Sequence, residues 1–214
     1  MTGLETAFAD PDPSIRRKAL MAAGITPLPS DLEVLVERCA VEPDFQVREM
    51  LTWALLRLPA ELVVPRLLAQ LDRPEPQARA QALHTLSKIR DSAAWPAVAA
   101  RLDDGDPDVL RTAWYAAVAV VPESERGWLA GKLAEKLGPG DREMRLSLSR
   151  ALVGLGEEAI APVLAARAAH KDEAVRQHAA ETERLLRDPD AGFEAGIYRA
   201  RREVGSGRTR SAIG

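Results

Sequence analysis

Apolar residues recur every three or four positions along most of the chain, which is the spacing of one face of an α-helix. In residues 47–55, for example, Val47, Leu51 and Leu55 share one side of the predicted helix. The composition agrees, because 37 Ala and 27 Leu are strong helix formers and aromatic and β-branched residues are few. The pattern therefore predicts an all-α protein.

One phrase of the sequence recurs six times: an acidic or Pro/Gly turn, an apolar residue, an arginine, and then Ala or Leu at helical spacing. The arginines follow one another at intervals of 31 to 34 residues and are Arg16, Arg48, Arg79, Arg111, Arg145 and Arg176. A second apolar segment lies between consecutive arginines, and three of these segments contain a proline, at 65, 96 and 162. Each repeat therefore predicts a helical hairpin, with a turn Asp capping the second helix.

A single hairpin cannot bury its apolar face, so the hairpins are expected to stack into one continuous α-solenoid domain. Phe193 and Ile197 are four residues apart, which predicts a short capping helix over 188–204. Residues 205–214 have the Gly/Ser and Arg content of a flexible basic tail. The predicted repeats are residues 2–26, 27–59, 60–91, 92–122, 123–156 and 157–187.

The repeats resemble the HEAT family, especially the short bacterial HEAT-like type of phycocyanobilin lyase subunits. The resemblance rests on a first helix P-x-L-x-x-x-L followed by D-x-x-V-R-x-x-A-x-x-x-L, best seen in residues 65–86 and 162–180. It extends over about residues 2–187 and implies an α-solenoid. The Ala- and Arg-rich style also looks like actinobacterial HEAT modules found beside MerR-type regulators, although this chain has no winged-helix segment.

The second helices carry the candidate binding residues. When each repeated arginine is taken as position zero, positions −1, +3 and +7 are predicted core, which places Trp114 in the core, and position +5 points outward. Position +5 holds Trp53 and His84 on neighbouring repeats, and in HEAT arrays the second helices generally line the concave face. Trp53 either contacts a partner or folds over a neighbouring helix. The predicted binding residues are Met50, Trp53, Arg57, His84, Lys88 and Arg150.

The repeated arginines are predicted to be structural. In arrays of this kind an arginine at this position commonly pairs with the turn Asp of the neighbouring repeat, which would form a ladder that holds the stack together. Arg16, Arg48, Arg79, Arg111, Arg145 and Arg176 are assigned to this ladder.

Neither a catalytic centre nor a cofactor is expected. The three histidines lack metal-ligand spacing, and no phosphate-binding or hydrolase motif is present. The single Cys39 excludes an internal disulfide and is expected to be a buried thiol. The chain has no signal-peptide pattern and no run of apolar residues long enough to span a membrane, so a cytoplasmic location is expected.

These features predict a non-enzymatic scaffold or adaptor that binds a protein partner on the second-helix face. The alternative is a regulatory or sensing module, linked to transcription, that captures a small apolar or aromatic ligand beside Trp53. A third possibility is a DNA-binding protein of the HEAT-like glycosylase type. It is disfavoured because residues 1–198 carry 24 basic and 31 acidic side chains, which should repel phosphate.

Overall fold

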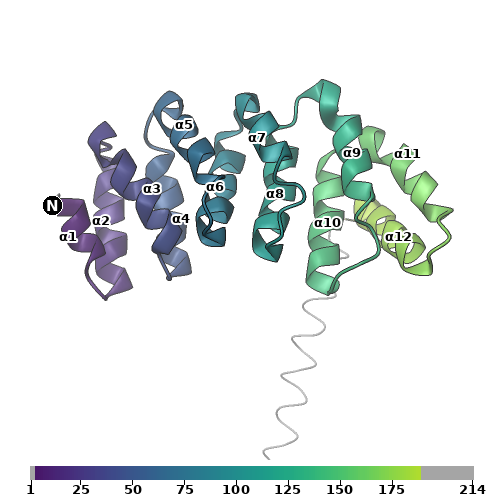
Figure 1. The fold of residues 1–214 in the computed structure, drawn as a ribbon, viewed down its shortest axis with the longest axis horizontal. Helices are drawn as coiled ribbons and strands as arrows, with labels where there is room; N and C mark the ends of the chain where they lie inside the picture. The colour runs from purple at the N-terminus through teal and green to yellow at the C-terminus, as the bar shows by residue number, and fades with distance from the viewer. Residues whose placement is uncertain (1–2, 189–214) are drawn as a thin grey trace, which may run out of the picture. The chain divides into compact units, whose positions relative to one another are not determined.

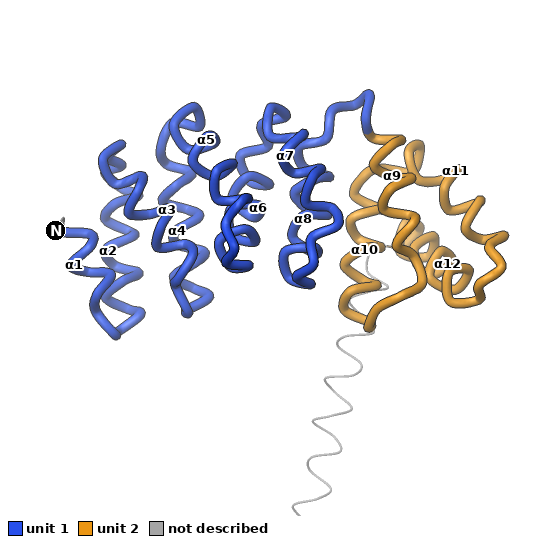
Figure 2. The backbone as a smooth tube through the Cα atoms, viewed as in Figure 1, with its two compact units in different colours: residues 1–125 blue, residues 126–214 orange. Residues whose placement is uncertain are grey.

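The computed structural model describes residues 3–188 and contains only helices and turns in this range. The predicted capping helix and basic tail lie outside the described residues, apart from Asp188. The chain separates into two compact units, residues 1–125 and 126–214 (Figure 2), and each is described by itself. None of the helices between residues 3 and 188 is long and apolar enough to cross a membrane.

The first unit contains four helical hairpins that lie side by side in chain order (Figure 1). Short 3-10 turns, at 29–31 and 92–94, precede α3 and α7, and a third, at 123–125, ends the unit. The second helices α2, α4, α6 and α8 pack against one another in that order. The helices are α1 (Gly3–Phe8), α2 (Pro13–Ile25), α3 (Leu32–Val41), α4 (Phe45–Leu55), α5 (Ala60–Gln70), α6 (Pro76–Ile89), α7 (Trp95–Ala99) and α8 (Pro107–Val120).

The second unit contains two further hairpins, in which α9 packs against α11 and α10 packs against α12. Its helices are α9 (Arg126–Ala134), α10 (Arg142–Gly154), α11 (Glu157–Ala168) and α12 (Glu173–Arg187). Within residues 3–188, twelve α-helices form six hairpins as predicted, and the all-α repeat fold is confirmed. A single continuous stack of all six stays a prediction.

Aspartates at the turns begin most of the second helices, as predicted. The carboxylates of Asp44, Asp106, Asp141 and Asp172 each accept a hydrogen bond from a free amide of the first turn. In the first hairpin this role belongs to Asp12, while Asp10 accepts from the Asp12 amide. Each cap residue therefore sets the register of the helix that follows it.

Counting from these caps corrects the register predicted for α8. Five of the repeated arginines lie four residues after their cap residue, but Arg111 lies five residues after Asp106 and Leu110 takes the fourth position. The residues buried in α8 are consequently Val109, Ala113, Trp114, Ala116, Ala117 and Val120. Trp114 lies in the core as predicted, whereas Leu110 and Val118, which were also expected there, are half-buried.

Each unit contains one buried polar network of the same design between consecutive second helices. In the first unit the Gln81 amide donates to Thr52 Oγ1 at 2.8 Å and to the Arg48 carbonyl at 3.3 Å. In the second unit His178 Nε2 lies 3.1 Å from Ser149 Oγ and 3.0 Å from the Arg145 carbonyl. These buried groups are therefore satisfied across the helix–helix contact rather than within one helix.

Candidate functional site

Four side chains form a line across the first unit because each lies nine residues after the cap residue of its helix. We call this line the second-helix strip; from α2 to α8 it consists of Met21, Trp53, His84 and Tyr115. Met21, Trp53 and Tyr115 are 52%, 36% and 41% exposed, and His84 is half-buried. Large apolar and aromatic side chains are thus presented to solvent at one repeated position.

Trp53 packs over the neighbouring helix and also remains partly exposed. A Cβ atom on Gly24 of α2 would lie 2.0 Å from Cζ3 of the Trp53 ring, so the indole rests directly on the glycine. Arg57, in the turn that follows α4, directs its Nε to the Gly24 carbonyl at 3.3 Å. Trp53 therefore folds over a neighbouring helix, which is one of the two interpretations, and its contact with a partner stays a prediction.

His84 connects the strip to a carboxylate on the adjacent helix. Its Nε2 lies 3.3 Å from Glu49 Oε1, which is an ion pair only when the imidazole is protonated. Burial lowers the pKa of His84, Glu49 acts in the opposite direction, and Lys88 lowers the pKa further. His84 is thus a weakly basic side chain in a partly apolar setting, and Lys88 is the exposed cation beside it.

Met50 lies beside the strip, in an open groove of about 400 Å³ between α2 and α4. Met21 and Met50 supply its apolar surface, and charged or polar neighbours include Arg17, Lys18 and Glu49. Arg150, the remaining predicted binding residue, is exposed on α10 in the second unit. The structure therefore places Met50 and Trp53 on α4, Arg57 in the turn after it, and His84 and Lys88 on the neighbouring helix α6. Arg150 lies in the separately described unit.

Tyr115 is the strip residue that the sequence pattern missed. Counting from Arg111 assigned the outward position to Ala116, which is fully buried. The signal that identifies Tyr115 is Asp106, because the side chain of this residue accepts from the Asp108 and Val109 amides and so begins the helix.

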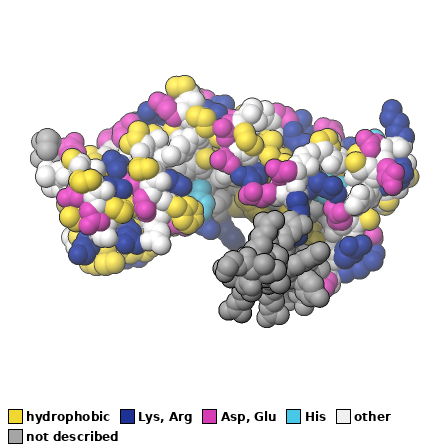
Figure 3. All heavy atoms as spheres, turned by 90° about the horizontal axis from the view of Figure 1, so that it is seen from below, with side chains coloured by type: hydrophobic (Ala, Val, Ile, Leu, Met, Phe, Trp, Pro, Cys, Tyr) yellow, Lys and Arg dark blue, Asp and Glu magenta, His cyan; other side chains and the backbone are white. Residues whose placement is uncertain are grey.

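Charges of both signs lie on the protein surface (Figure 3). On the face shown in Figure 3, Lys and Arg side chains alternate with Asp and Glu and with hydrophobic side chains, and no continuous basic area is visible. Two cations near the strip bond to neighbouring side chains: Arg17 bonds to Gln46 and Arg111 pairs with Asp108.

The repeated arginines bond first to their own turns. In four hairpins Nη1 donates to two consecutive backbone carbonyls, five and six residues earlier. These arginines are Arg16, Arg48, Arg79 and Arg176. The guanidinium thus satisfies carbonyl groups that the turn would otherwise leave without a partner.

Two of these arginines also reach the next hairpin, as the predicted ladder requires. Arg16 forms a buried bidentate pair with Glu42 at 2.8 and 2.9 Å, and Arg79 pairs with Asp104 at 2.9 and 3.0 Å. Burial alone would raise the pKa of Glu42 and of Asp104, but the arginine hydrogen bonds and a backbone amide outweigh it and hold each pKa below its usual value.

The remaining arginines depart from this arrangement. The acceptor position in the turn next to Arg48 is occupied by Arg73, which offers no carboxylate. Arg145 pairs instead with Glu181 on α12 at 2.7 Å, and Arg111 pairs with Asp108 of its own helix. Inter-hairpin pairing with a turn carboxylate therefore occurs where the neighbouring turn supplies an acid at the right position.

Cys39 is a buried thiol, as predicted, and burial raises its pKa to about 12. A thiol with this pKa is protonated at neutral pH and is a poor nucleophile. Within residues 3–188, no group of three or more His, Cys, Asp or Glu side chains is arranged to hold a metal ion.

Comparison with known proteins finds a match to a repeat family in part of the chain. Residues 42–119 match the family profile of HEAT repeats. The fold is similar to an engineered protein (17% identity, 87% of this chain and 99% of that chain, TM-score 0.47). It is also similar to the complex of CpcE and CpcF of phycocyanin lyase from Nostoc sp. PCC7120 (20% identity, 87% and 77%, TM-score 0.49). No curated protein matches the sequence.

Proposed function

We propose that this chain, a HEAT-repeat protein, is a non-enzymatic interaction module that binds an elongated segment of a protein partner along the second-helix strip. The observation that carries the proposal is that Met21, Trp53 and Tyr115 are exposed at the same position of α2, α4 and α8. Aromatic side chains at such positions commonly dominate the binding energy of interfaces.

The spacing of the strip favours a segment that crosses the helices. Packed helices lie roughly 8–10 Å apart, so a crossing segment would meet one strip residue per hairpin. A partner helix returns a side chain to the same face at about this distance every seven residues, and a polyproline II segment does so every three. An apolar residue at either interval would match the strip.

The charges beside the strip favour acidic residues in the partner. The cations next to strip residues are Arg17 and Lys18 on α2, Arg57 in the turn after α4, and Lys88 on α6. Glu49 is the nearby acid that pairs with His84. Acidic side chains between the apolar contacts would meet these cations and speed association.

Capture of a small apolar or aromatic ligand is the second candidate function, and the groove beside Met21 and Met50 is the observation that favours it. Only α2 and α4 line this groove, so a small ligand would be covered on one side. Small-molecule sites usually enclose most of the ligand surface, whereas an open groove suits a side chain of a protein partner.

Site-specific photocrosslinking tests the proposed binding face. A photoreactive phenylalanine analogue at Tyr115 or Met21 should crosslink a discrete protein partner in cells of the source organism. The same analogue at Val41, which is exposed on the first helix α3, is the matched control and should not crosslink that protein. Equal crosslinking from all three positions would contradict the proposal.

The identified partner then allows a quantitative test with purified proteins. Met21→Ser combined with Tyr115→Ser should weaken binding about tenfold or more, because both side chains are exposed and their loss removes apolar contact area. Val41→Ser should leave the affinity unchanged. Titration of this chain with small aromatic compounds, followed by tryptophan fluorescence, tests the second candidate function. Ligand capture requires a saturable change in the fluorescence when no partner protein is present.

A further inference from the structure

Within residues 3–188 nothing covers the outward face of α12, whereas the equivalent faces of α2, α4, α6 and α10 are covered. The residue eight positions after each cap points toward the next hairpin, as Thr52 and Ser149 show by bonding to α6 and α12. Leu20, Thr52, Leu83 and Ser149 hold this position in other hairpins and are all buried. Ala180 holds it in α12 and is exposed. The residues that the structure describes therefore leave this packing surface open.

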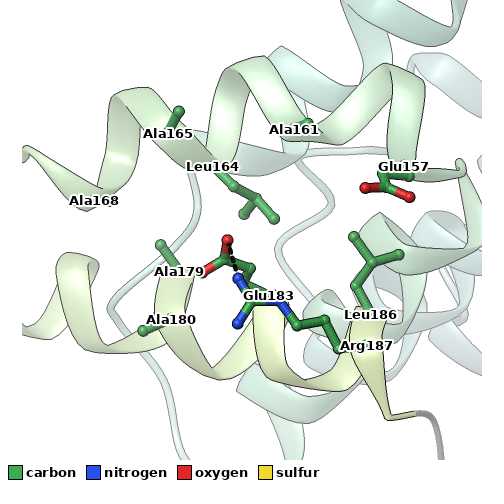
Figure 4. Close-up of a pocket in the computed structure, with 10 residues that line it drawn as sticks. All are labelled: Glu157, Ala161, Leu164, Ala165, Ala168, Ala179, Ala180, Glu183, Leu186 and Arg187. Atoms are coloured by element: carbon green, nitrogen blue, oxygen red, sulfur yellow. Dashed lines mark ion pairs between the residues drawn. The ribbon is translucent and has the colours of Figure 1, made fainter.

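A groove of about 270 Å³ runs along the open surface between α11 and α12 (Figure 4). Its wall on α11 is formed by Ala161, Ala165 and Ala168, with Leu164 between the helices, and Leu186 closes one end. Glu157 and the Glu183–Arg187 ion pair, at 2.7 Å, supply its charged groups. Alanines along a groove leave room for larger apolar side chains from whatever covers it.

We propose that residues 189–204 of this chain cover the groove. α12 ends at Arg187 because Asp188 precedes Pro189, and Asp188 adopts an extended conformation (φ −137°, ψ 91°). The chain thus leaves the helix beside Leu186 and Arg187, which line the groove. The inference is independent of the proposed partner-binding strip.

The sequence of this segment matches the groove in length, apolar content and charge. Phe193 and Ile197 have the spacing of one helix face, and the 12 residues from Phe193 to Val204 equal α11 in number. Arg199, Arg201 and Arg202 can face the carboxylates of Glu157 and Glu183. An open repeat face normally requires such a cover to remain soluble.

Methyl NMR of the full-length protein tests the contact. The ring current of Phe193 should shift the methyl signals of Leu164 and Leu186, so Phe193→Leu should move both signals. Phe45→Leu, a substitution on α4 in the other unit, is the matched control and should leave them in place. Unmoved Leu164 and Leu186 signals in Phe193→Leu would overturn the proposal.

Disulfide trapping distinguishes this segment from a second copy of the chain. Cys39 is buried, so Ala165→Cys and Ile197→Cys together would introduce the accessible thiols. Most of the oxidised protein should be monomeric with an internal disulfide. In the control pair, Ala165→Cys with Ser206→Cys, the fraction of monomer with an internal disulfide should be at least fivefold smaller. Predominantly intermolecular disulfides, or no difference between the two pairs, would overturn the proposal.

Discussion

At the scale of single residues, His178 and Gln81 bond to equivalent buried polar groups, one with an imidazole and the other with an amide. Each lies six residues after its cap and joins a carbonyl and a hydroxyl of the preceding second helix. The difference is that His178 Nδ1 also accepts the Gly138 amide at 3.0 Å. Acceptance at Nδ1 requires the neutral tautomer with the proton on Nε2, which then donates.

This geometry predicts a pH-dependent contribution to stability. Burial lowers the pKa of His178 below 6.5; the Arg145 carbonyl and Glu181 oppose this shift, and the Arg145 charge adds to it. Because the folded pKa is lowered, the unfolded chain binds more protons just below pH 6.5, so the stabilisation is complete above that pH and declines as the pH falls. His178→Gln should lose this dependence because Gln does not titrate.

Urea unfolding at several pH values checks this prediction. The free energy of unfolding of the wild type should fall relative to that of His178→Gln between about pH 7.5 and pH 5. His84 has a lowered pKa as well, but it is present in both proteins and cancels in the difference. A difference that stays constant with pH would show that His178 does not titrate in this range.

At the scale of helices, the repeated arginine bonds to its own turn in four hairpins, and in two of them it also pairs with a turn carboxylate of the next hairpin. Arg79→Ala should lower the free energy of unfolding by about 3 kcal/mol, because Asp104 would remain buried without its cation and the carbonyls of Arg73 and Pro74 would lose their donor. Arg66, which pairs with Glu33 on the exposed surface, is the matched control.

Arg66→Ala should change the free energy of unfolding by less than about 1 kcal/mol, since exposed ion pairs contribute little. Denaturant unfolding of both variants measures the contrast. An unchanged stability in Arg79→Ala would show that the inter-hairpin pair does not hold the repeats.

The contact between Gly24 and Trp53 predicts a second effect at this scale. Gly24→Ala should destabilise the protein by about 2 kcal/mol, because the added methyl group would displace the indole from α2. Gly131→Ala in α9 meets no atom within 4 Å and should instead stabilise its helix by up to about 1 kcal/mol.

A double variant tests whether the ring is the cause. In a Trp53→Ala background, Gly24→Ala should cost little or become favourable, which denaturant unfolding of the four proteins measures as a coupling free energy. Additive effects of the two substitutions would show that Trp53 does not occupy the space above Gly24.

The sequence could predict the hairpins because one arginine and one turn recur at nearly constant spacing. It could not place Tyr115, because in α8 the arginine is displaced by one residue and only the hydrogen bonds of Asp106 define the helix start. The packing of Trp53 on Gly24 was also beyond the pattern, since it depends on how closely two hairpins approach. Periodicity reports which residues share a face, and the distance between faces follows from side-chain packing.

At the scale of the whole molecule, the charge distribution disfavours a nucleic-acid partner. The chain carries 32 acidic and 29 basic side chains, and both signs are interspersed on the visible face (Figure 3). Phosphate binding needs a continuous basic surface, while here Glu49 and Asp108 lie among the cations near the strip. We therefore expect no binding of duplex DNA, even at about 50 mM salt.

Fluorescence anisotropy with a labelled duplex measures this directly, and a charge-reversed variant shows that the assay can detect binding. Glu49→Lys with Asp108→Lys removes both acids and leaves a row of cations across α2, α4, α6 and α8. This variant should bind DNA weakly, and its affinity for DNA should fall as the salt concentration is raised. Wild-type binding that weakens with salt in the same way would contradict the expectation and favour a nucleic-acid partner for the second-helix strip.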